Sequence, residues 1–101
     1  MIERHVIFNV IPGKEEDFET LFKEAYSVAM SKQPGFLSVT LLKEHEKEAV
    51  YKMVIRFQSL ETAAAWRDSS DHKALSPKIK ALYKESTVQV YDVIAEREIS
   101  S

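Results

Sequence analysis

Four stretches of the chain are rich in β-branched, aromatic and other large apolar residues, and this composition predicts β-strands. The first stretch ends at Pro12 and Gly13, where proline removes a backbone donor and glycine permits a sharp turn. The second and third are separated only by a short charged segment, HEKE, which predicts an antiparallel hairpin. The expected strands span residues 2–11, 36–43, 49–57 and 87–95.

The segment between the first two strands has the apolar spacing of an amphipathic helix. Acidic residues at 15, 16 and 17 suit its first turn, and Pro34 with Gly35 should end it. The apolar stripe that faces the core is expected to contain Phe18, Leu21, Phe22, Ala25 and Ala29.

The segment after the third strand predicts two short helices. Ser59 is a suitable N-cap for the alanine-rich stretch LETAAAWR, and the letters SSD are expected to interrupt that helix. Ser76 followed by Pro77 pairs a good N-cap with proline at the first helical position, so a second helix is expected to start there and continue through KIKALYKE.

The order of elements is therefore β-α-β-β-α-β, which is the ferredoxin-like arrangement of the α+β class. Both helical segments should cover one face of a four-stranded antiparallel sheet. The strands contain apolar runs such as VIF and MVI, which place large side chains on both faces. We therefore expect a homodimer through the uncovered sheet face, with an interface above ~2,000 Å².

Length, charge and cysteine content narrow the class of protein. A chain of 101 residues corresponds to one domain, expected over residues 1–95 with a tail at 96–101. Net charge is −2, from 14 basic and 16 acidic residues that are interspersed, so no nucleic-acid-binding face is expected. No apolar stretch approaches membrane-spanning length, and no signal peptide is expected. The absence of cysteine fits a cytoplasmic protein.

Candidate chemistry concentrates in the stretch AAAWRDSSDHKAL. No phosphate-binding loop, nucleophile elbow or zinc-protease motif occurs, and no histidine cluster has metal-ligand spacing, so no metal is expected. Trp66 could simply fill the core, or it could form the wall of a cavity. His72 could cap a turn, or it could exchange protons with a phenol or enol in the same cavity. His5 and His45 are expected at a rim and in a solvated turn.

Several polar residues interrupt the apolar strands. On the helix side of the sheet they would offer hydrogen-bonding groups to a cavity, whereas at strand ends or at a dimer seam water or the partner would satisfy them. Arg56 and Asp92 fit the second situation better. The full set comprises Asn9, Ser38, Thr40, Arg56, Gln89 and Asp92.

Together with the order of elements, the stretches PGKEEDFETLF, PGFLSVTLL and AAAWRDSSDHKAL make the chain similar to the antibiotic biosynthesis monooxygenase family of the dimeric α/β-barrel superfamily. The resemblance covers about residues 1–95. It implies homodimers whose sheets form a barrel, and a pocket between each sheet and its helices. It also implies oxidation of phenols to quinones by O2 without flavin, haem or metal. By this resemblance, Trp66 would form an apolar wall, His72 would transfer a proton, and Asn9 would hydrogen-bond a substrate oxygen.

A second branch of that family degrades haem, with an axial histidine about ten residues after the tryptophan and an asparagine on the first strand. The residue ten positions after Trp66 is Ser76, and Asn9 lies three residues late when Gly13 is aligned. Both departures argue against haem degradation. The leading expectation is therefore a cofactor-independent monooxygenase acting on a phenol or quinol. The alternatives are a dimeric binding protein without catalysis and, less favoured, the haem-degrading activity.

Overall fold

A computed structural model describes residues 1–99, in which four strands and two helical segments follow the expected order. The sheet order is β2-β3-β1-β4, and the neighbouring strands are all antiparallel. The strands are β1 (Ile2–Val10), β2 (Phe36–Lys43), β3 (Val50–Phe57) and β4 (Tyr83–Asp92). The helices are α1 (Glu15–Leu21), the π-helical turn η1 (Phe22–Tyr26), α2 (Ser27–Ser31), α3 (Leu60–Asp68) and α4 (Ser70–Lys80).

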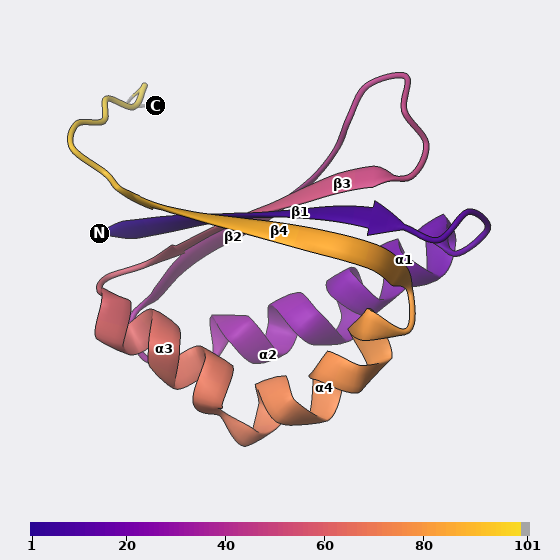
Figure 1. Ribbon diagram of the computed structural model, residues 1–101. Coiled ribbons are helices and arrows are strands. Elements are labelled where there is room, and N and C mark those ends of the chain that lie inside the picture. The colour runs from indigo at the N-terminus through magenta and orange to yellow at the C-terminus, as the bar shows by residue number, and fades with distance from the viewer. Residues whose placement is uncertain (100–101) are drawn as a thin grey trace.

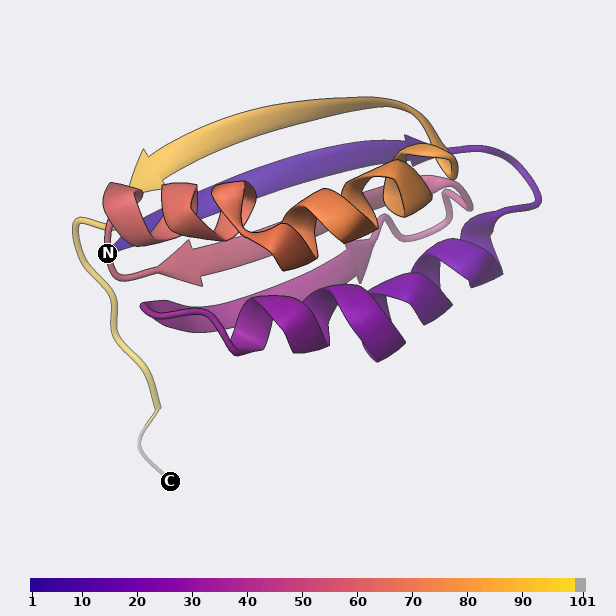
Figure 2. The ribbon, with the colours of Figure 1, turned by 90° about the horizontal axis from the view of Figure 1, so that it is seen from below.

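The molecule has two layers, with both helical segments on one face of the sheet and, within residues 1–99, no helix or strand covering the other face (Figure 1). Seen from the helical side, the α1–η1–α2 segment and the α3–α4 segment run across the sheet side by side (Figure 2). The ferredoxin-like α+β fold predicted from the sequence is confirmed.

The core lies between these two layers. Alternate residues of β1 and β3 point toward the helices, as expected for a sheet with one covered face. The helices contribute the aromatic residues Phe18, Phe22 and Trp66. The strand residues of the core are Val6, Phe8, Val10, Tyr51, Met53, Ile55 and Phe57.

The first helical segment departs from the expected straight helix because its middle is a π-helical turn. Its buried residues are Phe18, Phe22, Tyr26 and Met30, spaced by four. Residues spaced by four drift by roughly 40° per step around an α-helix, and one wider turn offsets part of that drift. The stripe therefore includes Tyr26, while Ala25 and Ala29 are only half-buried.

The second helical segment confirms one predicted boundary and corrects another. Ser59 caps α3 in a reciprocal capping box with Thr62, as expected. The interruption, however, is Ser69 alone, and α4 starts at Ser70 and continues through Pro77. A proline inside a helix leaves the carbonyl four residues earlier without its donor. Here that carbonyl belongs to the exposed Lys73, where water can supply the hydrogen bond.

The last strand starts earlier than the sequence analysis predicted. It starts at Tyr83 rather than residue 87, because α4 begins six residues earlier than Ser76 and ends at Lys80. A register shift between Asn9 and Val10 of β1 accompanies the entry into this strand. The strand ends at Asp92 rather than at the expected residue 95. Residues 93–95 and the described part of the expected tail, residues 96–99, form no helix or strand.

The open face of the sheet is less apolar than its runs suggested. Most side chains there are charged or polar, and only a few are aliphatic, such as Ile7, Leu42 and Val54. Each apolar run sends every second residue into the core. Arg56 donates hydrogen bonds to Glu3 and Glu96 on this face.

Residues 100–101 of the expected tail lie outside the described part of the chain. No helix within residues 1–99 has the length and apolarity needed to cross a membrane.

Candidate functional site

A cavity of about 210 Å³ lies between the sheet and the helices, beside β4. Its floor consists of inward-facing strand residues, and its walls come from η1, α3 and α4. His72 and Tyr26 both reach it, whereas Trp66 does not line it. The lining residues are Arg4, Val6, Phe8, Tyr26, Met53, Ile55, Arg67, His72, Ser76, Ile79, Lys80, Tyr83, Ser86 and Val88.

A single residue, Ser69, brings Trp66 and His72 together. In a straight helix, six residues correspond to roughly 240° of rotation, which would place the two side chains on different faces. Ser69 has extended backbone angles, and its hydroxyl both donates to the Trp66 carbonyl oxygen (2.7 Å) and accepts from the His72 backbone N–H (3.1 Å). The resulting break between α3 and α4 turns His72 back toward the indole.

Trp66, Tyr26 and His72 form an aromatic cluster behind the cavity. The ring centroids of Trp66 and His72 are 5.0 Å apart, and those of Trp66 and Tyr26 are 5.5 Å apart, both in edge-to-face geometry. Trp66 is only 1% exposed. Its indole therefore supports and orients the two polar aromatic groups that face the cavity.

The environment keeps both groups uncharged at neutral pH. Burial is the main cause that lowers the pKa of His72, and the positive charges of Arg4 and Arg67 act in the same direction. Burial likewise raises the pKa of Tyr26 to about 12. His72 can therefore accept a proton, and the Tyr26 hydroxyl can donate a hydrogen bond. The charged groups near His72 are Arg4, Arg67, Lys80 and Asp68, of which only the last favours the imidazolium.

Arg4 is a cavity residue that the sequence analysis missed. It occupies an inward-facing position of β1, two residues before Val6. In the sheet it pairs with Ile55 of β3 and Val90 of β4. Its Nε atom is buried without a hydrogen-bond partner among the described residues. The signal in the sequence was a charged residue in phase with Ile2, Val6 and Phe8.

The predicted polar strand residues lie elsewhere. Asn9 sits between the inward-facing Phe8 and Val10, so it points to the open face, where its amide donates to Glu85 (3.0 Å). The structure therefore brings His72 and Trp66 together but leaves Asn9 on the other side of the sheet. By strand register, the open face also holds Ser38, Thr40, Arg56 and Gln89, while Asp92 pairs with the inward-facing Ile2.

A larger hollow of about 490 Å³ lies on the open face near the β2–β3 hairpin. It is lined by Ile7, Leu42 and Val50, together with lysine stems, and it contains no histidine. This hollow has no histidine that could act as a base, so the cavity beside β4 is the candidate site. Within residues 1–99, no group of three His, Asp or Glu side chains is placed to hold a metal ion.

Comparison with known families identifies the chain. A model of the family described as antibiotic biosynthesis monooxygenase matches residues 1–78. The chain belongs to this family. This match confirms the family resemblance seen in the sequence. The matched residues include the whole stretch from Trp66 to His72.

Solved structures show the same fold at low identity. A variant of SnoaB, a cofactor-independent oxygenase from Streptomyces nogalater, is 20% identical, with 94% of each chain covered and a TM-score of 0.86. A candidate antibiotic biosynthesis monooxygenase from Nitrosomonas europaea is 14% identical, covering 94% of this family member and 100% of that chain, with a TM-score of 0.83. A conserved protein from Methanosarcina mazei is 20% identical, with 89% of each chain covered and a TM-score of 0.81. No curated protein matches.

Proposed function

We propose that this protein is a cofactor-independent monooxygenase that oxidises a phenolic or quinol substrate with O2 in the cavity beside β4. The observation that carries the proposal is His72, a neutral imidazole at the cavity wall, held against Trp66 by Ser69. Family membership supports a monooxygenase type of reaction, and the fold is shared with the oxygenase SnoaB.

The proposed reaction needs little from the protein because the substrate supplies all the electrons. His72 accepts the phenolic proton, which leaves an electron-rich anion that reduces O2. One oxygen atom of O2 enters the ring to form the quinone, and the other leaves as water with two hydrogens from the substrate. The cations around the cavity stabilise the anion, and Tyr26 donates a hydrogen bond to the substrate oxygen.

Haem degradation fits the cavity less well. A volume of about 210 Å³ is below the range of ~300–1,000 Å³ typical for drug-sized ligands, and haem is a large ligand. Ser76, which occupies the position ten residues after Trp66, lines the cavity with a hydroxyl in place of an imidazole. We therefore assign no role to haem.

The test is O2 consumption by the purified protein with a panel of naphthols and hydroquinones. We expect uptake above the uncatalysed rate, and a loss of 10²-fold or more in kcat for His72→Gln, since a positioned base contributes ~10²–10⁴-fold. His45→Gln is the matched control, because that side chain is 97% exposed in the hairpin loop. Binding without O2 uptake would instead support the non-catalytic binding protein.

The homodimer is a second part of the proposal. No helix or strand of the described residues covers the open sheet face (Figure 1), and its aliphatic residues Ile7, Leu42 and Val50 line the 490 Å³ hollow. Leu42 is 47% exposed there. Light scattering after gel filtration should give twice the chain mass, and Leu42→Glu should shift it toward the monomer. A native protein that is monomeric at high micromolar concentration contradicts this assembly.

A further inference from the structure

The cavity beside β4 has a charge opposite to that of the whole chain. The chain carries 16 acidic and 14 basic residues, yet the cavity lining contains Arg4, Arg67 and Lys80 and no acidic side chain. These three cations come from β1, α3 and α4, so the tertiary fold gathers them at one place. A positive cavity in an acidic protein indicates a ligand that carries negative charge.

Arg4 lacks the partners that a half-buried guanidinium normally has. The ion pairs of residues 1–99 involve Glu3, His5, Arg56 and other residues but not Arg4. Its Nε atom is buried and unpaired in that part of the chain. An unpaired buried donor costs free energy, and a ligand that supplies the missing acceptor would remove this cost on binding.

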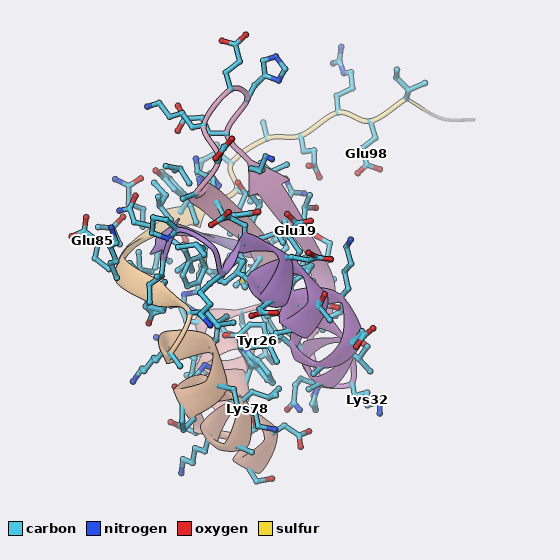
Figure 3. The ribbon with its side chains drawn as sticks, turned by 90° about the vertical axis from the view of Figure 1, so that its right-hand side faces the viewer. Glu19, Tyr26, Lys32, Lys78, Glu85 and Glu98 are labelled. Atoms are coloured by element: carbon cyan, nitrogen blue, oxygen red, sulfur yellow. The ribbon has the colours of Figure 1, made fainter. Side chains whose placement is uncertain are left out.

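The other walls set the kind of molecule that the cavity accepts. Phe8, Tyr26 and Tyr83 provide aromatic surface, and the rings of Phe8 and Tyr83 lie 5.1 Å apart. Tyr26 belongs to η1, and its ring faces α4 (Figure 3), with its centroid 6.2 Å from that of His72. A volume of about 210 Å³ suits one or two fused rings rather than a larger polycycle.

From these observations we propose that the cavity selects a one- or two-ring aromatic substrate that carries a carboxylate, and that Arg4 binds this carboxylate through its guanidinium. This inference rests on the proposed function in placing the substrate in the same cavity. The carboxylate is distinct from the reacting phenol. A phenol arrives protonated and is ionised by His72, whereas the permanently charged Arg4 is complementary to a group that arrives as an anion.

The test compares two ligands of the same shape, 2-naphthoate and its neutral analogue 2-naphthamide, by isothermal titration calorimetry. We expect naphthoate to bind the native protein at least tenfold more tightly. Arg4→Met should reduce this preference to threefold or less, and Arg4→Lys should retain part of it. Lys80→Gln should weaken naphthoate binding slightly, and Lys78→Gln, on the exposed side of the same helix, should not change it.

The outcomes separate this inference from the proposed function. Equal binding of the two ligands by the native protein, no naphthoate binding at millimolar concentration, or an undiminished preference in Arg4→Met overturns the carboxylate site. The salt dependence of native binding is a check that needs no variant, because only naphthoate affinity should fall with added NaCl. A naphthoate preference without O2 uptake from any phenol overturns the monooxygenase proposal alone. Uptake from neutral phenols without that preference overturns the carboxylate site alone.

Discussion

Replacing Arg4 with methionine should stabilise the protein while it removes carboxylate binding. Methionine, like arginine, has an unbranched side chain, so it can occupy the same space beside Ile55 and Val90. Unlike arginine, it places no hydrogen-bond donor there. A buried unsatisfied donor costs ~1–3 kcal/mol. Because Nε is the only atom of Arg4 that is both buried and unpaired, we take the lower end of this range. The expected gain in unfolding free energy is about 1 kcal/mol, which corresponds to a rise of about 4–8 °C in Tm.

Urea unfolding followed by the fluorescence of Trp66 measures this change directly, since it is the only tryptophan and is buried in the core. Arg97→Met, at an exposed position beyond β4, is the control and should change stability by less than ~0.5 kcal/mol. A loss of 1 kcal/mol or more in Arg4→Met would show that the guanidinium stabilises the fold, which refutes the reading of Arg4 as a residue held ready for a ligand.

Three further predictions concern the elements around the cavity. Ser69→Ala removes the N-cap of α4 and should cost ~1 kcal/mol in urea unfolding and shift the NMR signals of the His72 ring, whereas Ser70→Ala should do neither. Gly35→Ala should cost about 2 kcal/mol, because its φ is +80° and a Cβ would lie 2.5 Å from the Thr62 side chain. Gly13→Ala, with φ +92° and no atom within 4 Å, should cost clearly less; equal costs would exclude the Thr62 clash. Because the pKa of His72 is lowered in the fold, stability should be full above the unfolded pKa of ~6.5 and should fall as pH drops below it; His72→Gln should remove that part of the pH dependence.

The sequence determined the order of elements and the layer arrangement. Strands and helices have different apolar periods, and those periods are visible without coordinates. Capping is equally local, so Ser59 identified the start of α3. Where two local signals competed, the sequence was misleading: Ser76 with Pro77 has the chemistry of a helix start, but Ser69 begins the helix and Pro77 lies inside it. The exposed carbonyl of Lys73 makes that proline tolerable, and exposure is a tertiary property.

The candidate site was only partly visible in the sequence. The stretch from Trp66 to His72 is local, and it contributed to the family resemblance, which the family model confirms. A common location for the two rings was one of the alternatives that the sequence left open, and the structure places them 5.0 Å apart. The face on which a strand residue lies depends on register and on the position of the helices, so Asn9 was expected at the site and lies on the open face. The same alternation turns Arg4 inward. Arg4 lies in the same cavity as Arg67 and Lys80, which come from two other elements. Only the tertiary structure brings these three cations together.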